Sequence, residues 1–202
     1  MEKKRGNPYK HHYKYGKQTE PIDLQAFKDI MQNGKFVSPS RDKSLLAFLY
    51  WFGVRRSEVT ERVKEDFKLK DGLLIVNCPA KKGGEREPLE VSVDYPFVDL
   101  VVKQLERTRR TMANPTRRVW NISEATAWRI VSRAMPKHYP HYFRLNRATR
   151  FLEDPTTTIP EMKAWFGWKS TRTIDDYVGY SRRHIRRQRE RLARELSPSR
   201  ET

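Results

Sequence analysis

Cationic and aromatic side chains recur at positions where the sequence indicates that a helix or a hairpin ends. Guanidinium groups bind anionic oxygens through paired hydrogen bonds, lysine and histidine transfer protons, and a phenol can act as a nucleophile. The side chains that could combine in such chemistry are Arg55, Lys81, Lys82, His141, Arg144, Trp168 and Tyr177. Their order along the chain and their local context, more than any single member, make the set informative.

Each member of this set also has an ordinary structural explanation. An arginine that follows the end of a helix, as Arg55 follows Gly53, interacts favourably with the helix dipole. Turn lysines are usually solvated, and a histidine three residues before an arginine usually shares a surface helix face with it. A tryptophan or tyrosine belongs more often to the core than to a catalytic site. Taken singly, these residues would not indicate a site.

Several other chemistries have no pattern to support them in this sequence. His11 and His12 fall in the N-terminal segment, and no His/Cys/carboxylate cluster has metal-ligand spacing. No glycine-rich loop leads into Lys-Ser/Thr, and no nucleophile elbow supports Ser-His-Asp catalysis. We therefore expect an activity without a metal ion, a nucleotide or another cofactor.

Two helices are the first elements that the spacing of apolar residues predicts. The first covers residues 23–33, with Asp23 as its N-cap. The second begins at Ser38 or Ser40 and ends at Gly53. Its apolar density indicates that it is largely buried, so Arg55, which follows its end, would lie next to the core.

Three short strands are expected next, after a short helix at residues 57–63. Asp71-Gly72 is a strong signal for a hairpin turn between the first two strands, and residues 81–85 indicate a second turn. The strands cover roughly residues 66–70, 73–80 and 87–93.

From Pro96 onward the chain is expected to be helical. Ser123 and Thr126 form an imperfect capping box, and prolines and glycines separate the later helices. The expected helices cover residues 96–110, 123–135, 140–154, 159–168, 170–181 and 181–196. The predicted fold class is therefore mainly α with a small three-stranded antiparallel β-sheet.

Length and composition indicate one substantial globular domain. The chain has 202 residues, of which 37% are hydrophobic and 33% charged, without a low-complexity tract. No apolar run is long enough to span a membrane, and the N-terminus lacks the apolar stretch of a signal peptide. The single cysteine, Cys78, lies in an apolar segment and is expected to be a buried structural thiol. These features favour a cytoplasmic location.

The net charge of +17 points to a polyanionic partner, because neutralising phosphates releases condensed counterions. Residues 1–20 carry six Lys/Arg against two Glu, and residues 181–202 carry eight Arg against three Glu. The middle of the chain keeps the remaining +8, so the charge belongs to the fold as well as to its ends. Charge alone does not separate a DNA enzyme from a ribosomal protein or a binder of anionic membranes.

Three segments, in order, resemble the signature boxes of the tyrosine recombinase or phage integrase family. FGVRRSEV resembles Gly-Leu-Arg-x-Ser-Glu, and HYFRLNRAT resembles His-x-Leu-Arg-His-x-x-Ala-Thr. FGWKSTRTIDDY resembles Leu-Gly-His-x-x-x-x-Thr-x-x-Tyr. The turn KKGGER lies between the first two boxes, where the family keeps a catalytic lysine. The resemblance covers roughly residues 20–182 and is closer in wording to archaeal or archaeal-virus members.

The resemblance implies a role for each member of the set. Arg55 matches the first catalytic arginine, with Glu58 as the acid that orients it, and Arg144 matches the second arginine. His141 matches the histidine of the second box. Tyr177, nine residues past Trp168, matches the nucleophile better than Tyr180 does.

The sequence departs from the family pattern at three places. Leu145 replaces the histidine that often follows the second arginine, and Trp168 replaces the usual third-box histidine, although some members use Trp there. An indole N–H can still donate one hydrogen bond. The turn is one residue tighter than usual, so either Lys81 or Lys82 could be the catalytic lysine.

The implied activity is site-specific DNA recombination through a covalent 3′-phosphotyrosine intermediate, without metal or ATP. The implied partner is double-stranded DNA, bound by a homotetramer, with no membrane involved. Further residues expected to contact DNA are Arg56, Arg86, Arg147, Lys169, Arg172, Arg182 and Arg183.

The resemblance divides the chain into three parts. Residues 1–20 are expected to form a flexible basic arm, residues 21–182 the catalytic domain, and residues 183–202 a basic helix or tail. The family's separate N-terminal DNA-clamping domain would not fit in twenty residues. The final helix could be solvated or could dock on a neighbouring subunit.

Two alternative functions remain open from the sequence. One is a non-catalytic DNA-binding protein that retains the recombinase fold, and the other is a DNA-relaxing enzyme like a type IB topoisomerase. Covalent adducts would exclude the first, and exchange between two duplexes would exclude simple relaxation.

Overall fold

Helix α2 (Pro39–Phe52) runs through the middle of the structure and organises the elements around it. The computed structural model describes residues 22–81, 84–136, 138–171 and 174. Every side chain from Ser44 to Phe52 is buried, as the apolar density of this segment predicts. Helices α4, α5 and α6 and strand β3 all pack against α2.

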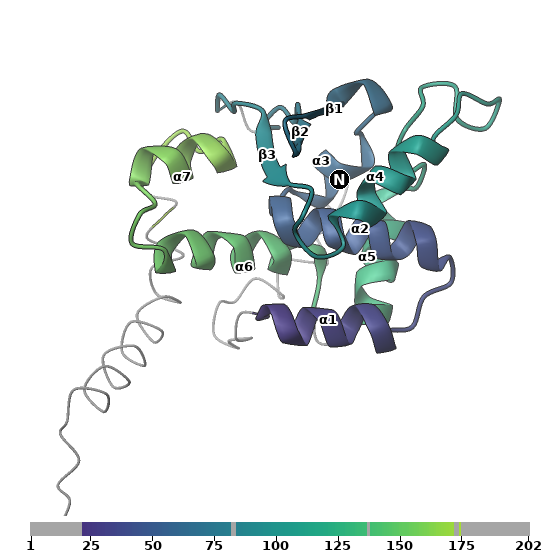
Figure 1. Ribbon diagram of the computed structural model, residues 1–202, viewed down its shortest axis with the longest axis horizontal. Coiled ribbons are helices and arrows are strands. Elements are labelled where there is room, and N and C mark those ends of the chain that lie inside the picture. The colour runs from purple at the N-terminus through teal and green to yellow at the C-terminus, as the bar shows by residue number, and fades with distance from the viewer. Residues whose placement is uncertain (1–21, 82–83, 137, 172–173, 175–202) are drawn as a thin grey trace, which may run out of the picture.

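The other elements complete a mainly helical fold with one small sheet, which confirms the predicted fold class (Figure 1). The helices are α1 (Leu24–Asn33), α3 (Arg56–Thr60), α4 (Val98–Arg107), α5 (Glu124–Ala134), α6 (Pro140–Glu153) and α7 (Ile159–Phe166). A 3-10 turn, η1 (Lys64–Asp66), precedes the strands β1 (Phe67–Lys70), β2 (Leu73–Val76) and β3 (Leu89–Ser92).

The ends of the first two helices follow the predicted capping signals. The Asp23 carboxylate accepts a hydrogen bond from the Ala26 amide at 2.7 Å, so Asp23 is the N-cap of α1. Ser38 precedes α2, and its amide donates to the Asp42 carboxylate at 3.1 Å. Gly53 ends α2 in the left-handed conformation (φ +61°), which a glycine adopts at low cost.

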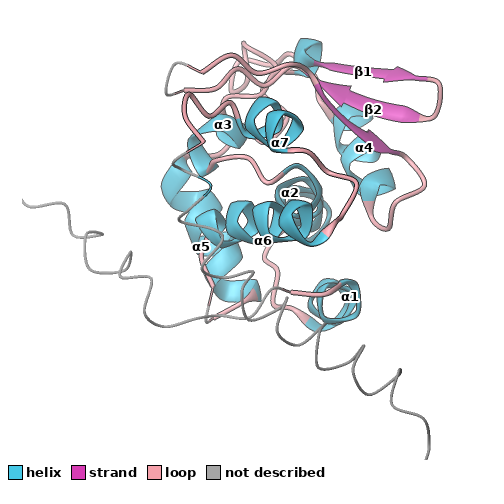
Figure 2. Ribbon diagram, turned by 90° about the vertical axis from the view of Figure 1, so that its left-hand side faces the viewer, coloured by secondary structure: helices cyan, strands magenta, loops and turns pink. Residues whose placement is uncertain are grey.

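The three strands form an antiparallel sheet in the order β1-β2-β3, at one side of the helical core (Figure 2). Asp71 and Gly72, at φ +50° and +73°, make the predicted two-residue turn between β1 and β2. Leu74, Val76, Leu89 and Val91 point into the core, and β3 packs against α2.

Strand β2 ends at Val76, four residues earlier than the sequence pattern predicts. The next two carbonyls accept hydrogen bonds from arginine side chains and not from β3: Asn77 from Arg62 at 2.9 Å, and Cys78 from Arg86 at 2.8 Å. The chain therefore leaves the sheet at this point and runs toward α3 and α7 before β3 begins.

Residues 108–122 connect α4 to α5 without a helix, so α4 ends three residues before the predicted boundary at residue 110. The Lys64 amide donates to the Arg117 carbonyl at 3.1 Å, and the Val119 amide donates to the Arg62 carbonyl at 2.9 Å. Trp120 is fully buried, and its indole N–H donates to the Ser44 hydroxyl at 2.9 Å. Backbone pairing with a distant segment and one buried anchor thus hold this series of turns in place.

Helices α6 and α7 form one side of the molecule, where α7 lies beside α6 (Figure 1). Thr158 and Glu161 cap the start of α7 reciprocally, and Gly167 ends α7 in the left-handed conformation (φ +60°). The expected arm at 1–20, the final helix at 181–196 and most of 170–181 lie outside the described residues. Within the described residues, no helix has the length and hydrophobicity to cross a membrane.

Candidate active site

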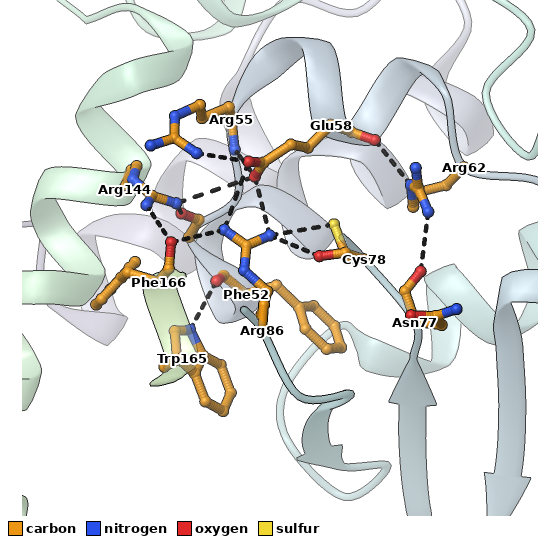
Figure 3. Close-up of polar contacts among 11 residues, drawn as sticks. Phe52, Arg55, Glu58, Arg62, Asn77, Cys78, Arg86, Arg144, Trp165 and Phe166 are labelled. Atoms are coloured by element: carbon orange, nitrogen blue, oxygen red, sulfur yellow. Dashed lines mark hydrogen bonds and ion pairs between the residues drawn. The ribbon is translucent and has the colours of Figure 1, made fainter. Parts of the chain in front are cut away.

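The carboxylate of Glu58 is fully buried and is the common acceptor of an arginine cluster (Figure 3). It accepts from the Arg55 amide at 2.8 Å and from Arg55 Nη1 at 2.7 Å. Arg86 Nη1 donates at 3.1 Å, and Arg144 Nη1 lies 3.9 Å away. We call Arg55, Glu58, Arg86 and Arg144 the arginine centre.

The pKa of Glu58 lies below its ordinary value in spite of its burial. Burial alone would raise this pKa, but the Arg86 charge, the hydrogen bond from the Arg55 amide, and the charges of Arg144 and Arg55 outweigh it. The carboxylate therefore stays ionised at neutral pH. A fixed buried anion holds the surrounding guanidinium groups in place.

Arg55 is the member of the arginine centre that reaches the surface. Gly53 ends α2, Val54 is buried, and Arg55 then stands at the N-cap position of α3. Its side chain is 21% exposed, whereas that of its partner Glu58 is 0% exposed. One edge of the Arg55 guanidinium is thus oriented by protein while other donors remain available to a ligand.

Arg144 lies deeper and joins three parts of the chain. Its side chain is 1% exposed, and its Nη2 donates to the Phe166 carbonyl at 2.7 Å. Its Nη1 donates to the Gly53 carbonyl at 3.3 Å. The end of α2, the second turn of α6 and the end of α7 therefore meet at this one side chain.

Trp168 forms part of the wall around Arg144. Its ring is buried and stacks on Phe166 with centroids 4.6 Å apart and an interplanar angle of 21°. The Arg144 guanidinium carbon lies 4.8 Å from the Phe166 ring centroid and 5.7 Å from that of Trp168. Trp168 is thus a core residue and a neighbour of the arginine centre at once.

His141 lies in the first turn of α6, one turn before Arg144. His141 is partly exposed, whereas the residues that follow it, Tyr142 to Asn146, are buried. The i,i+3 spacing places it on the same side of α6 as Arg144, as the sequence predicts.

The lysine connection, residues 77–88 between β2 and β3, passes beside α3. Lys81 is 36% exposed and pairs with Glu61, a 45% exposed side chain just after the end of α3. Lys82, the other candidate for the catalytic lysine, lies outside the described residues. The structure thus places Lys81 next to the helix that carries Glu58, and it leaves the choice between the two lysines open.

Arg86 has a different place from the one expected of a DNA contact. Its side chain is 0% exposed, and its guanidinium donates to Glu58, to the Cys78 carbonyl and to the Phe166 carbonyl. A side chain without exposed surface cannot bond to DNA, so that expectation is wrong for this conformation. The alternation of buried and exposed residues in β3, where Leu89 and Val91 are buried, does not extend back to Arg86. The sequence pattern therefore gave no indication that Arg86 is buried.

The remaining candidates for DNA contact have varied surroundings. Arg56 is partly exposed and pairs with Glu124 at 3.0 Å, and Lys169 is exposed after Trp168. Arg147 lies with its guanidinium carbon 4.7 Å from the Phe151 ring and 4.8 Å from the Trp165 ring. Burial and the nearby Arg150 charge lower the pKa of Arg147 to about 10. Arg172, Tyr177, Arg182 and Arg183 lie outside the described residues.

Cys78 is a buried thiol, as its apolar context predicts. Burial raises its pKa to about 11, so the thiol is protonated at neutral pH and unsuited to nucleophilic attack. Among the described residues, no group of three His, Cys, Asp or Glu side chains is arranged to hold a metal ion.

Comparison with known proteins gives matches only at the level of structure. No protein-family model and no curated protein matches this sequence. The structure of XerH site-specific recombinase bound to its difH substrate, a pre-cleavage complex, matches with a TM-score of 0.64 and 14% identity. That match covers 80% of this chain but only 51% of XerH, so the chain spans about half the length of that protein.

Two further structures have the same fold at similarly low sequence identity. XerA recombinase matches with a TM-score of 0.62 and 17% identity over 86% of this chain and 66% of XerA. The Tn1549 transposon integrase in complex with transposon right-end DNA matches with a TM-score of 0.55 and 13% identity, over 88% of this chain and 67% of the integrase. The chain therefore has the tyrosine recombinase catalytic-domain fold.

Proposed function

We propose that this chain is a tyrosine recombinase that cleaves and rejoins DNA through a covalent 3′-phosphotyrosine intermediate. The observation that carries the proposal is the arginine centre. Arg55 and Arg144, from distant segments, lie on one buried carboxylate, Glu58, in a fold shared with recombinases. A buried anion surrounded by arginines is costly for stability alone, which favours a functional reason for the cluster.

The arginine centre would supply the positive charge that phosphodiester cleavage needs in the absence of a metal. Arg55, through its exposed donors, would bond to a non-bridging phosphate oxygen, and its planar fork stays charged throughout. Arg144 would add positive potential from beneath. The ordinary pKa of tyrosine is near 10, so this potential favours the ionised form of Tyr177.

The reaction would proceed by direct displacement at phosphorus. The Tyr177 oxygen bonds to phosphorus, its proton passes to His141, and the bond from phosphorus to the 5′-oxygen breaks. The leaving 5′-oxygen takes a proton from Lys81 or Lys82. The 5′-hydroxyl of a second strand then reverses these steps, so no ATP is consumed.

Double-stranded DNA is the partner that we propose, with recombination by a homotetramer in the cytoplasm. The net charge of +17 and the DNA-bound recombinases of the same fold support the first part. Removing the residues after Ser181 tests whether the C-terminal segment docks on a neighbour. Loss of synapse formation with retained DNA binding supports docking, and unchanged assembly refutes it.

A nicked suicide duplex tests the proposed function. Wild-type protein is expected to form a covalent DNA adduct and then to join the strand to a second duplex. No adduct would favour a DNA-binding protein without activity. Adducts and relaxation of supercoils, but no exchange between duplexes, would favour the topoisomerase-like alternative.

A further inference from the structure

Arg86 connects the segments on which the proposed site depends, although the resemblance assigns it no catalytic role. Its Nη1 donates to the Cys78 carbonyl at 2.8 Å and to Glu58 at 3.1 Å. Its Nη2 donates to the Phe166 carbonyl at 2.9 Å. One fully buried guanidinium thus contacts the segment that follows β2, helix α3 and the end of α7 (Figure 3).

The bond from Arg86 to the Cys78 carbonyl ties together the two limbs of the lysine connection. Both limbs also pack against Gly167. A Cβ added at Gly84 would stand 2.2 Å from the Gly167 carbonyl oxygen, and one added at Gly167 would stand 2.4 Å from the Ala80 Cβ. The residues on either side of the lysine pair are therefore fixed against the end of α7.

Arg86 and Arg144 also share one hydrogen-bond acceptor and one ion-pair partner. The Phe166 carbonyl accepts from both arginines, at 2.9 and 2.7 Å. The Glu58 carboxylate lies 3.1 Å from Arg86 Nη1 and 3.9 Å from Arg144 Nη1. A shift of Arg86 would therefore move the lysine connection relative to Arg144 and Glu58.

We propose that Arg86 is a positioning residue that sets the lysine connection in register with the catalytic arginines. The proposal rests on the proposed function, because it assigns Arg86 a part in delivering the proton to the leaving oxygen. An arginine suits the task because its planar fork bonds several acceptors in fixed directions, whereas a lysine ammonium is a single point charge. Arg86→Lys keeps the buried charge beside Glu58 but removes this fork.

The identity of the leaving atom separates positioning of the lysine from a merely structural effect. An alcohol oxygen must be protonated as its bond to phosphorus breaks. A thiol has a pKa of about 8.5, so a 5′-sulfur in the same position leaves as a thiolate without a proton. A defect in proton delivery is therefore relieved by sulfur, and a defect in folding or in charge stabilisation is not.

The test compares wild type and Arg86→Lys on suicide duplexes with a 5′-oxygen or a 5′-sulfur at the cleaved bond. We expect adduct formation by Arg86→Lys to fall about 10²-fold on oxygen, the usual cost of a misplaced catalytic group, and to recover most of this loss on sulfur. DNA binding should stay unchanged. An equal loss on both substrates, or no loss on either, overturns the proposal.

Arg62→Lys is the matched control. Arg62 is another buried arginine outside the arginine centre, and it donates to the Glu58 carbonyl and to the Asp66 carboxylate. It also donates to the carbonyl of Asn77, the first residue of the lysine connection, whereas Arg86 holds this connection to the end of α7. We expect this variant to lose stability without any selective recovery on sulfur. If Arg62→Lys shows the same recovery, general loosening of the fold explains the effect and the proposal fails.

Gly84→Ala keeps the proposal testable if Arg86→Lys does not fold. Its added methyl group would displace the lysine connection from Gly167 without altering any charge. We expect the same recovery on sulfur, and its absence refutes the proposal. An inactive wild-type protein on both substrates would instead refute the proposed function, so the two failures are distinguishable.

Discussion

The arginine centre and the lysine connection lie side by side, yet they are built in opposite ways. Glu58, Arg86 and Arg144 are at most 1% exposed and are bonded to backbone carbonyls and to one another. Lys81 is 36% exposed and pairs with the exposed Glu61. The first arrangement fixes charge in place, and the second leaves a long side chain at the surface.

This difference matches the two kinds of chemistry in the proposed reaction. Stabilising a transition state by charge works best when the donors are already oriented and need no reorganisation. Delivering a proton requires a group that approaches the leaving atom and then withdraws. Changes in the arginine centre should therefore affect stability and activity together, whereas substitution of the catalytic lysine should affect activity alone.

Glu58→Gln should have the largest effect on the folded state. It leaves the buried guanidinium groups without their counter-charge, and breaking a buried ion pair in this way costs about 3–5 kcal/mol of unfolding free energy. Urea denaturation followed by circular dichroism measures this cost. A loss no larger than that of a surface substitution would mean that the arginine centre is not an interlocked unit.

The same variant tests a pH dependence of known sign. Although burial alone would raise the pKa of Glu58, the charge of Arg86 and the other arginine contacts hold it below its ordinary value. The stabilisation should therefore be complete above the unfolded-state pKa of about 4.3 and should be lost as the pH falls through the lower folded-state value. Glu58→Gln should lack this acid-side loss of stability in urea titrations.

Comparing Arg144→Ala with Arg55→Ala separates the roles of the buried and the partly exposed arginine of the arginine centre. Each substitution removes a charged donor, and we expect adduct formation to fall about 10²–10³-fold in both. Arg144 is 1% exposed and Arg55 is 21% exposed, so only Arg144→Ala should also lower the thermal unfolding midpoint strongly. Equal midpoints for the two variants would refute the distinction between a deep and a superficial arginine.

Lys81→Ala and Lys82→Ala should show which lysine transfers the proton. The catalytic one should lose about 10²–10⁴-fold in cleavage of the oxygen substrate and regain most of it on the 5′-sulfur substrate. Lys81→Ala should change the unfolding free energy by no more than about 0.5 kcal/mol, because this side chain is 36% exposed and exposed side chains contribute little. Full activity in both variants would remove the lysine connection from the mechanism.

Glu61→Gln should have the smallest effect. The pair between Glu61 and Lys81 lies at the surface, where such pairs contribute about 0–1 kcal/mol. If Lys81 is the proton donor, releasing it from Glu61 should change the cleavage rate without changing stability, and Glu61→Asp serves as the control that keeps the charge. A large loss of stability would show that this pair is a structural element.

The sequence predicted the local features of the fold well because they depend on neighbouring residues. The N-caps at Asp23 and Ser123, the turn at Asp71-Gly72 and the glycine that ends α2 are all set within a few residues. The hydrogen bonds that Arg55 donates to Glu58 likewise span only three residues and follow from the first signature box.

Long-range hydrogen bonds to the backbone explain what the sequence did not reveal. The turns of residues 108–122 are held by backbone bonds that join Arg117 and Val119 to Lys64 and Arg62, and no local pattern carries that information. Arg86 looks like a surface arginine in the sequence, yet its partners include the Phe166 carbonyl eighty positions away. An arginine that bonds to carbonyls leaves no complementary residue type by which to recognise it.

The most direct test of the account is to identify the residue that becomes joined to DNA. Wild-type protein is incubated with the nicked suicide duplex and digested, and the modified peptide is sequenced by mass spectrometry. We predict a 3′-phosphoryl nucleotide on Tyr177, and no adduct in a Tyr177→Phe variant that still binds DNA. An adduct on Tyr180 or any other residue, or one that persists in Tyr177→Phe, would contradict the mechanism.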